Sequence, residues 1–295
     1  MTTASQRKPG FVPSRSAEMV LAEGAGDAAF ATTLAKGLVV LEAFEAGASV
    51  LGNMELSEQT GIPRPTVARL THTLAELGYL HHDQDLAKYR LGTRALRMAH
   101  PLLAGMQFRQ AARPLMQELA ESVRGTVSIG LLDGTAMIYV ETARSGNVGP
   151  HFPDIGMPIP VILTAMGRAA SEVLPPAASA LLEQRIKTDD AALWSAAREN
   201  YRAGIRQCVE RGFCTCYGEY MASIHAVAAP LFYARNLKQS FAINCGIPAF
   251  RLQSGQLESE IGPRIKALAV SIRSLVNESE PLVDTRELPR KKVAK

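Results

Sequence analysis

The chain has few of the residues that build covalent or membrane-bound frameworks. Only four of its 295 residues are cysteines: Cys208, Cys214, Cys216 and Cys245. So few cysteines in a chain of this size argue against a disulfide framework. No apolar run approaches the roughly 18 residues of a membrane-spanning helix, and residues 1–30 lack the apolar core of a signal peptide. We therefore expect a cytoplasmic protein.

Signatures of catalysis are also missing. The sequence contains no glycine-rich phosphate loop, no pair of catalytic carboxylates and no internal repeat. Its composition, 47% hydrophobic over 295 residues, is sufficient for two domains with sizeable cores. We therefore expect no catalytic residues, no metal site and no cofactor.

The charge of the chain is concentrated at its end. The formal net charge is +4. Residues 286–295 alone carry five basic residues and one acidic residue, so everything before them balances to zero. Such a tail can touch DNA phosphates non-specifically, but it is more often only a disordered end. Evidence for DNA binding must therefore come from the local placement of Arg and Lys.

Residues 56–77 have the pattern of a helix-turn-helix DNA reader. Thr60 is expected to end a first helix, and Gly61 supplies a left-handed turn without steric cost. Pro65 suits the first turn of a second helix, because its missing N–H is not needed there. The apolar stripe of that second helix consists of Val67, Leu70, Leu74 and Leu77.

The opposite side of the second helix is polar. At about 100° per residue, Arg69, His72 and Glu76 point away from the stripe. Arg64 and Thr66 lie at the N-terminal end, where free N–H groups and the helix dipole favour phosphate. An ordinary amphipathic helix with a solvated face would show the same pattern, so these residues alone leave both interpretations open. The candidate DNA contacts here are Arg64, Pro65, Thr66, Arg69 and His72.

Two β-prone runs follow, at residues 78–82 and 88–91, joined by a polar turn. On one face of the second run lie Lys88 and Arg90, and on the other lie Tyr89 and Leu91. This predicts a basic β-wing that packs through its apolar face and contacts DNA through Lys88 and Arg90. A helix-turn-helix followed by a wing is much more specific for DNA binding than either half alone.

The remaining elements flank this unit. Before it, one helix is predicted from a stripe of Leu34, Leu38, Leu41 and Phe44, ended by Gly47. After it, residues 93–123 are expected to form helices that are interrupted at Pro101 and entered again near Pro114. Their position between two domains suggests a linker that also pairs two subunits.

From residue 126 the pattern changes to strands, with a helical stretch between them. Thr164 is expected to cap a helix that runs to about Val173. Strands before and after helices, with hairpins, predict an α+β domain around an antiparallel sheet. The predicted strands are residues 126–132, 137–142, 212–217, 224–232 and 239–246, and the predicted helices after the cap are residues 177–211 and 257–277.

Taken in order, these motifs resemble one family, the bacterial transcriptional regulators of the isocitrate lyase regulator (IclR) type. The resemblance covers about residues 30–277, and its strength lies in the order and spacing of individually weak motifs. They are Leu-Ser-Glu-x-x-Gly-Ile-Pro from Leu56, Tyr89-Arg90-Leu91-Gly92, Gly156-Met157-Pro158-Ile159-Pro160, Thr164-Ala165-Met166-Gly167-Arg168-Ala169, Arg211-Gly212-Phe213 and Ala228-Ala229-Pro230.

The resemblance implies a sequence-specific regulator that is not an enzyme, with dimers, often paired into tetramers, on pseudo-palindromic operators. Two departures from the family pattern matter: Pro65 stands where Ser or Thr is usual, and Thr71 replaces a usual Leu beside the core stripe. The implied domains are a disordered segment 1–28, a winged helix-turn-helix 29–92, linker helices 93–123, a GAF-like effector domain 124–278 and a flexible basic tail 279–295.

The resemblance also implies a pocket for a small organic effector. On the loop side it would be lined by Leu163, Thr164, Ala165 and Met166. On the strand side it would be lined by Cys214, Cys216, Tyr217, Gly218, Ile224, Ala226, Ile243, Asn244 and Cys245. This lining is apolar, with Thr164, Tyr217 and Asn244 as polar anchors, and it suits an organic acid. Relatives with similar strands respond to aromatic acids or their breakdown products, so this class is favoured; well-packed core is the alternative.

Two other interpretations of this region stay open. Cys214 and Cys216 fall on one face of a strand, and with His225 they could form a metal site, a redox switch or the nucleophile–base pair of a thiol redox enzyme. A C-x-C with one His is not a complete tetrahedral ligand set, and small apolar cysteines in a core are commoner. A ligand-free architectural DNA binder is the last alternative.

Overall fold

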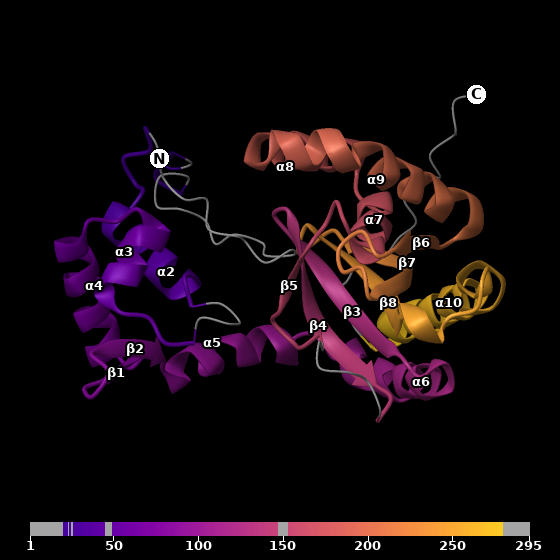
Figure 1. The fold of residues 1–295 in the computed structure, drawn as a ribbon, viewed down its shortest axis with the longest axis horizontal. Helices are drawn as coiled ribbons and strands as arrows, with labels where there is room; N and C mark the ends of the chain where they lie inside the picture. Colours follow the sequence, from indigo (N-terminus) through magenta and orange to yellow (C-terminus); the bar gives the residue numbers. More distant parts are fainter. Residues whose placement is uncertain (1–19, 23, 25, 45–48, 147–152, 280–295) are drawn as a thin grey trace. The chain divides into compact units, whose positions relative to one another are not determined.

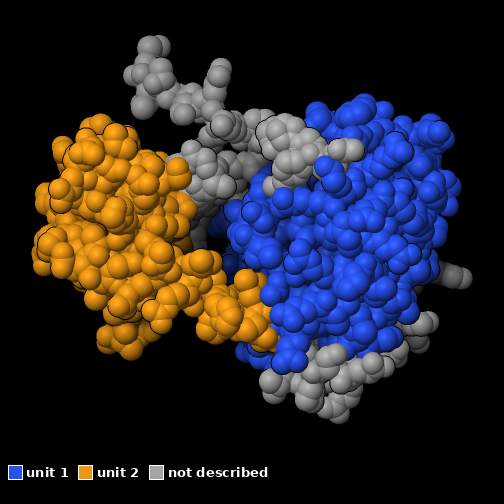
Figure 2. Space-filling view, turned by 90° about the horizontal axis from the view of Figure 1, so that it is seen from below, with its two compact units in different colours: residues 1–12, 106–295 blue, residues 13–105 orange. Residues whose placement is uncertain are grey.

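A computed structural model of the chain describes residues 20–22, 24, 26–44, 49–146 and 153–279. Within these residues the chain divides between Gly105 and Met106 into two compact units: the first in chain order ends at Gly105 and is orange in Figure 2, and the second begins at Met106 and is blue. Most of the segment predicted to be disordered at the N-terminus, the predicted helix end at Gly47 and the basic tail from residue 280 lie outside the described residues. No helix in the described part is both long and apolar enough to cross a membrane.

The first unit is a winged helix-turn-helix (Figure 1). Its helices and strands follow in the order α2 (Thr32–Glu42), α3 (Asn53–Thr60), α4 (Arg64–Glu76), β1 (Leu80–Asp83), β2 (Lys88–Leu91) and α5 (Thr93–Ala104). Helix α3 ends as predicted, because Gly61 adopts a left-handed φ of 71° and its N–H bonds to the Ser57 carbonyl at 3.0 Å. Pro65 occupies the first turn of α4. β1 and β2 pair antiparallel to form the wing.

The core of this unit differs from the predicted stripes. Leu34 and Leu38 of α2 are 64% and 46% exposed, and Leu77 is 50% exposed. Instead, the buried side of α2 consists of Ala35, Gly37, Val39 and Val40. Helix α2 is apolar almost all round, so helical spacing could not distinguish its two sides. Val67 and Thr71 are the buried positions of α4, with Leu70 and Leu74 packed against the core.

The predicted linker is divided between the two units. Pro101 lies inside α5 and does not interrupt it; the helix ends at Ala104 and the chain turns through Gly105. Helix α6 (Phe108–Val123) begins before Pro114, which it also contains. Helix α5 has no buried residue, whereas α6 packs on the sheet of the second unit and buries six of its residues. The prolines therefore did not mark the break.

The second unit is α+β, as predicted, around one antiparallel sheet of order β5-β4-β3-β8-β7-β6. The strands are β3 (Thr126–Asp133), β4 (Ala136–Arg144), β5 (Pro158–Pro160), β6 (Cys214–Tyr217), β7 (Ile224–Ala234) and β8 (Gln239–Pro248). The short edge strand β5 was not predicted, because its two prolines resemble a loop.

Helices cover both faces of this sheet (Figure 1). On one face lies α7 (Ala165–Glu172), with α8 (Pro176–Asp189) and α9 (Ala191–Arg211) beyond it. On the other lie α6 and α10 (Gly262–Ser279), preceded by short turns η1 (Ala249–Arg251) and η2 (Leu257–Ile261). Thr164 caps α7 as predicted, accepting the Gly167 N–H at 3.2 Å. Gly130 allows α7 to sit close, since a Cβ there would lie 2.4 Å from Met166 Sδ.

Candidate DNA-binding and effector sites

The predicted reading face of α4 is open to solvent. Arg64, Pro65, Arg69 and His72 are exposed and Thr66 is half-buried, whereas Val67 and Thr71 on the other side are fully buried. The structure therefore brings these five side chains onto the accessible half of a helix whose other half is fixed in the core. The arrangement leaves two guanidinium groups, those of Arg64 and Arg69, available on this face.

Thr71 is a buried polar contact between the two helices of the motif. Its hydroxyl hydrogen bonds the Asn53 Oδ1 atom of α3 at 2.9 Å and the Val67 carbonyl at 3.0 Å. The usual apolar contact of a Leu is thus replaced by hydrogen bonds that satisfy the hydroxyl. The Thr71 side chain is 0% exposed, so these hydrogen bonds lie within the core of the first unit.

The two basic residues of the wing are paired with acids of the same unit. Lys88 forms an ion pair with Glu55 of α3, and Arg90 forms one with Asp83 of β1. The hydrogen bond from Lys88, with that from the Gly52 N–H, lowers the pKa of Glu55. The wing packs through Tyr89, which is 9% exposed, but Leu91 is 44% exposed, which corrects the predicted apolar face. Lys88 therefore also ties the wing to the helix-turn-helix.

Several of the predicted effector residues lie together on the α7 side of the sheet. The Sγ atom of Cys214 contacts the Ala165 carbonyl at 3.4 Å, and that of Cys216 contacts the Leu163 carbonyl at 3.3 Å. Both thiols thus point to the loop and helix start that were predicted to face them. The apolar cluster here contains Ala165, Met166, Cys214 and Cys216, with Leu163 and Ala226 packed against it. Ile224 shares a face with Ala226, and Gly218 forms a turn with φ of 70° after β6.

Three predicted residues lie on the other face. Tyr217 is 50% exposed, and its hydroxyl bonds Glu258 of η2. Cys245 belongs to the cross-strand row of Val127, Val227 and Thr215, and Ile243 to the row of Ile129 and Ala229. Because faces alternate along a strand, Ile243 and Cys245 lie opposite Asn244, on the side of α6 and α10. The predicted set had joined three consecutive residues of β8, which one face cannot hold.

A buried tyrosine joins Asn244 on the α7 side and was missed by the sequence analysis. Tyr139 of β4 is 7% exposed and Asn244 is 9% exposed. Burial raises the pKa of the Tyr139 phenol, while the hydrogen bond from Asn244 acts in the opposite direction. The Asn244 Oδ1 atom is buried and has no hydrogen-bond partner among the described residues. Thr164, the other anchor, is occupied in capping α7 and in bonding the Pro160 carbonyl at 2.8 Å.

A buried arginine next to this cluster is already neutralised. Arg168 of α7 is 2% exposed, bonds the Thr215 carbonyl and forms an ion pair with Glu219. Burial alone would raise the pKa of Glu219, but the hydrogen bond and charge of Arg168 outweigh it and lower this pKa. Asn200 adds a hydrogen bond to the same carboxylate at 3.2 Å. Arg168 belongs to the family-like motif of residues 164–169, but nothing in the sequence indicated that Glu219 would be its partner.

Cys214, Cys216 and His225 do not come together as a metal site or a nucleophile–base pair. His225 lies opposite Tyr217 in the strand pairing and meets its ring edge to face, with ring centroids 5.2 Å apart, on the face opposite Cys214 and Cys216. Among the described residues, no group of three or more His, Cys, Asp or Glu side chains is placed to hold a metal ion. Burial raises the pKa of the Cys216 thiol to about 11, which disfavours the reactive thiolate. These cysteines therefore act as small core residues here.

Comparison with known proteins agrees with this arrangement. Residues 33–84 match the IclR helix-turn-helix domain, and residues 100–274 match the bacterial transcriptional regulator IclR C-terminal domain. The chain belongs to the IclR family. An IclR family transcriptional regulator from Brucella abortus has a similar structure, with a TM-score of 0.76, 33% identity, and coverage of 84% of this chain and 93% of that one.

Curated IclR-type relatives span most of the chain. The regulator TsaQ1/TsaQ2 of Comamonas testosteroni is 26% identical over 84% of this chain and 90% of its own length. The p-hydroxybenzoate hydroxylase transcriptional activator of Acinetobacter baylyi is 26% identical over 82% of this chain and 91% of its own length. The protein is therefore a DNA-binding transcriptional regulator of a family with an effector domain, and not an enzyme.

Proposed function

We propose that this regulator recognises an operator with the exposed face of α4 and steadies the complex with its wing, acting in the cytoplasm. The observation that carries this proposal is the exposed side chains of Arg64, Arg69 and His72, with the half-buried Thr66, on a helix anchored by Val67 and Thr71. Arg69 reads a base edge or an adjacent phosphate, and Arg64 contacts phosphate at the helix start. Lys88 and Arg90 add backbone contacts from the wing.

The operator is bound by a homodimer, which pairs further into a dimer of dimers. Helix α5 supports the homodimer, because it buries none of its residues and exposes Leu96, Met98 and Leu102 by 77%, 59% and 56%. A contiguous apolar face of this kind is covered in a stable complex. A second copy would place two recognition helices on half-sites about 34 Å apart, or multiples of it.

The effector is a small organic acid, and a hydroxylated aromatic acid fits best. Its apolar ring would lie against Leu163, Met166 and Ala226, and its hydroxyl would donate to the unpartnered Asn244 Oδ1 atom beside Tyr139. A buried acceptor without a partner is costly, so a ligand that satisfies it gains affinity. The name of the Acinetobacter relative, an activator of p-hydroxybenzoate hydroxylase, supports the same chemical class.

One experiment tests the two parts separately. An operator duplex is selected from a random pool with the full chain, and its affinity is measured by fluorescence anisotropy with and without 4-hydroxybenzoate. Selection of a palindromic site supports the DNA-reading assignment, and failure to enrich any sequence contradicts it. Thermal stabilisation by 4-hydroxybenzoate, but not by cyclohexane carboxylate, supports the effector class; equal or absent stabilisation by both contradicts it.

A further inference from the structure

A β-bulge in strand β4 places side chains two positions apart on opposite faces of the sheet: one faces the candidate effector site and the other faces α6. In its pairing with β3, Tyr139 stands opposite Gly130 and Glu141 opposite Ile129, so Val140 is an extra residue between them. This is a β-bulge, which breaks the alternation of side chains. Tyr139 therefore lies in the cluster under α7, while Glu141, two positions later, lies on the face of α6.

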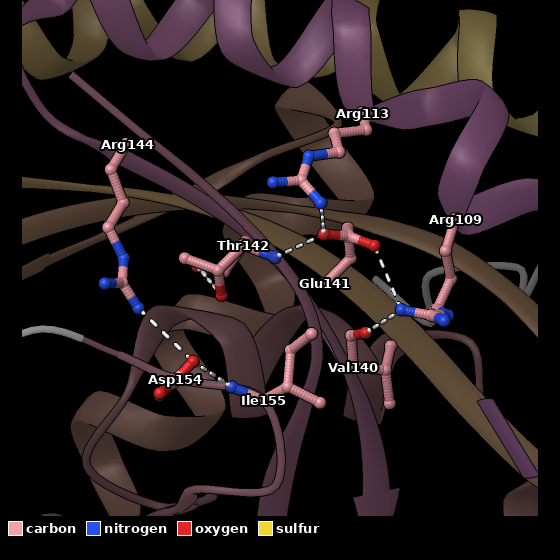
Figure 3. Close-up of polar contacts among 9 residues, drawn as sticks. Arg109, Arg113, Val140, Glu141, Thr142, Arg144, Asp154 and Ile155 are labelled. Carbon is pink, nitrogen blue, oxygen red and sulfur yellow. Dashed lines mark hydrogen bonds and ion pairs between the residues drawn. The ribbon is translucent and has the colours of Figure 1, made fainter. Parts of the chain in front are cut away.

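The ion pair of Arg109 in α6 with Glu141 in β4, which we call the clamp, lies at this bulge (Figure 3). Arg109, in the first turn of α6, donates through Nη1 to the Val140 carbonyl at 2.7 Å and to Glu141 Oε2 at 3.0 Å. Glu141 is 3% exposed and Arg109 is 8% exposed. The second carboxylate oxygen accepts the Thr142 N–H at 3.2 Å and lies 3.8 Å from Arg113. Both partners of the clamp are thus buried and bonded at the irregular point of the strand.

The clamp also holds the part of the second unit that is closest in sequence to the DNA-binding unit. Arg109 follows Gly105, the last residue of the first unit, by four positions. The start of α6 is therefore joined to the bulge by the hydrogen bonds of Arg109 to Val140 and to the neighbouring Glu141. On the opposite face the same strand presents Tyr139, beside the unpartnered Asn244 Oδ1 atom.

We propose that Arg109 and Glu141 are positioning residues that couple effector binding beside Tyr139 to the start of α6, and so to operator affinity. This inference rests on the proposed effector site. A ligand changes DNA binding only if it favours one of two arrangements of the protein. The bulge is the point where β4 departs from regular pairing with β3, and Arg109 contacts it directly through the Val140 carbonyl.

The test uses the full chain with Glu141→Gln, Arg109→Gln and the charge-reversed pair Arg109→Glu with Glu141→Arg. Arg202→Gln is the control, because it removes another Arg–Glu pair of the same unit, that of Arg202 in α9 with Glu183 in α8. Operator affinity is measured with and without 4-hydroxybenzoate, and binding of 4-hydroxybenzoate is measured by calorimetry. Circular dichroism and thermal unfolding identify any variant that does not fold.

Wild type and Arg202→Gln are expected to change operator affinity about fivefold or more with 4-hydroxybenzoate. Glu141→Gln and Arg109→Gln should reduce this response below about twofold, which is less than the roughly 5- to 150-fold of typical couplings. Both variants should still bind 4-hydroxybenzoate within about threefold of wild type, because neither residue lies in the proposed effector site. The charge-reversed pair restores an ion pair but lacks a donor for the Val140 carbonyl, so its response should also stay below about twofold. A purely structural ion pair would lower thermal stability and leave the response intact, which would overturn the proposal.

If wild type does not bind 4-hydroxybenzoate, the proposed effector class is wrong, but the role of the clamp can still be tested. The test then compares the operator affinities of the variants and wild type without ligand. If Arg109 positions α6, the ligand-free operator affinity of folded Glu141→Gln should differ from wild type by about fivefold or more, as for other coupled sites. Arg202→Gln should stay within about twofold of wild type on the same scale. Wild-type affinity in both folded clamp variants would contradict the inference.

Discussion

At the residue scale, the candidate functional side chains fall into two groups: those that already have an ion-pair or hydrogen-bond partner in the fold, and those that do not. Arg168, Lys88 and Arg90 each have a carboxylate partner. Arg69 is exposed on α4, where no acidic partner is described for it. The Asn244 Oδ1 atom is buried and accepts no hydrogen bond from any residue that the structure describes. A group that the fold leaves unsatisfied is available for a ligand, so Arg69 and Asn244 are the stronger candidates.

Arg69→Ala is expected to weaken specific operator binding by about 1–3 kcal/mol, because a base-edge or adjacent phosphate contact is lost. The side chain is exposed, so thermal stability should not change. The measurement is the ratio of affinities for the selected operator and a scrambled duplex. Arg206→Ala, which removes an exposed arginine of α9, is the control. A folded Arg69→Ala protein with an unchanged ratio would remove Arg69 from the reading face.

Cys216 should make the fold less stable at alkaline pH. Burial raises its thiol pKa from 9.0 to about 11, against the opposing charge of Arg168. Above pH 9 the unfolded chain releases this proton while the folded chain keeps it, so the free energy of unfolding falls as pH rises to 11. The slope is at most about 1.4 kcal/mol per pH unit for one group. Urea unfolding under reducing conditions at pH 8 and pH 10 should show a smaller loss for Cys216→Ala; equal losses would contradict this assignment.

At the scale of the elements, sequence patterns predicted types better than faces. The turn at Gly61 and the cap at Thr164 were predictable, because each depends on local backbone chemistry. The buried side of α2 was not predictable, because apolar residues of this helix lie on most of its sides. The bulge at Val140 and the pairing of Arg168 with Glu219 depend on contacts between distant segments. The candidate effector site was therefore predicted where it follows one motif, and incompletely where it combines side chains of β4 and β8, which lie on either side of β3.

The wing should contribute to DNA binding without choosing the sequence. Lys88→Ala with Arg90→Ala is expected to weaken binding to all duplexes and to reduce the log–log salt slope by about one unit per lost phosphate contact. Glu55→Gln is the matched control, since it releases Lys88 from its ion pair and should strengthen binding. A salt slope equal to wild type in the double variant would show that both cations serve only Glu55 and Asp83.

At the scale of the whole molecule, the two units are joined by a short connection at Gly105, between a helix that buries nothing and one that is fixed to a sheet. Leu96→Glu with Leu102→Glu should convert the dimer to a monomer, because it charges the exposed face of α5. Sedimentation velocity measures this, and operator affinity should fall with it. Leu181→Glu, at a 59% exposed position of α8, is the control. A dimeric double variant would move the interface elsewhere.

The effector response is a property of both units, and blocking the candidate site should abolish it while DNA binding survives. Ala226 lies on the edge of the cluster that holds Cys216 and Met166, on the strand face shared with Asn244. Ala226→Phe would fill the space proposed for the aromatic ring, at a cost in stability of about 1–3 kcal/mol for overpacking. Its DNA-binding unit is untouched, so ligand-free operator affinity should match wild type.

The measurement is operator affinity with and without 4-hydroxybenzoate in wild type, Ala226→Phe and Ala177→Phe, the last an exposed position of α8 that controls for the added ring. Wild type and Ala177→Phe should respond, and Ala226→Phe should not. Asn244→Leu provides a second variant if Ala226→Phe does not fold, because it removes the unpartnered acceptor and keeps the same branching of the side chain. A coupling of about 1–3 kcal/mol is sufficient for regulation. If a folded Ala226→Phe protein responds as wild type does, the effector binds elsewhere and Tyr139 and Asn244 are core residues.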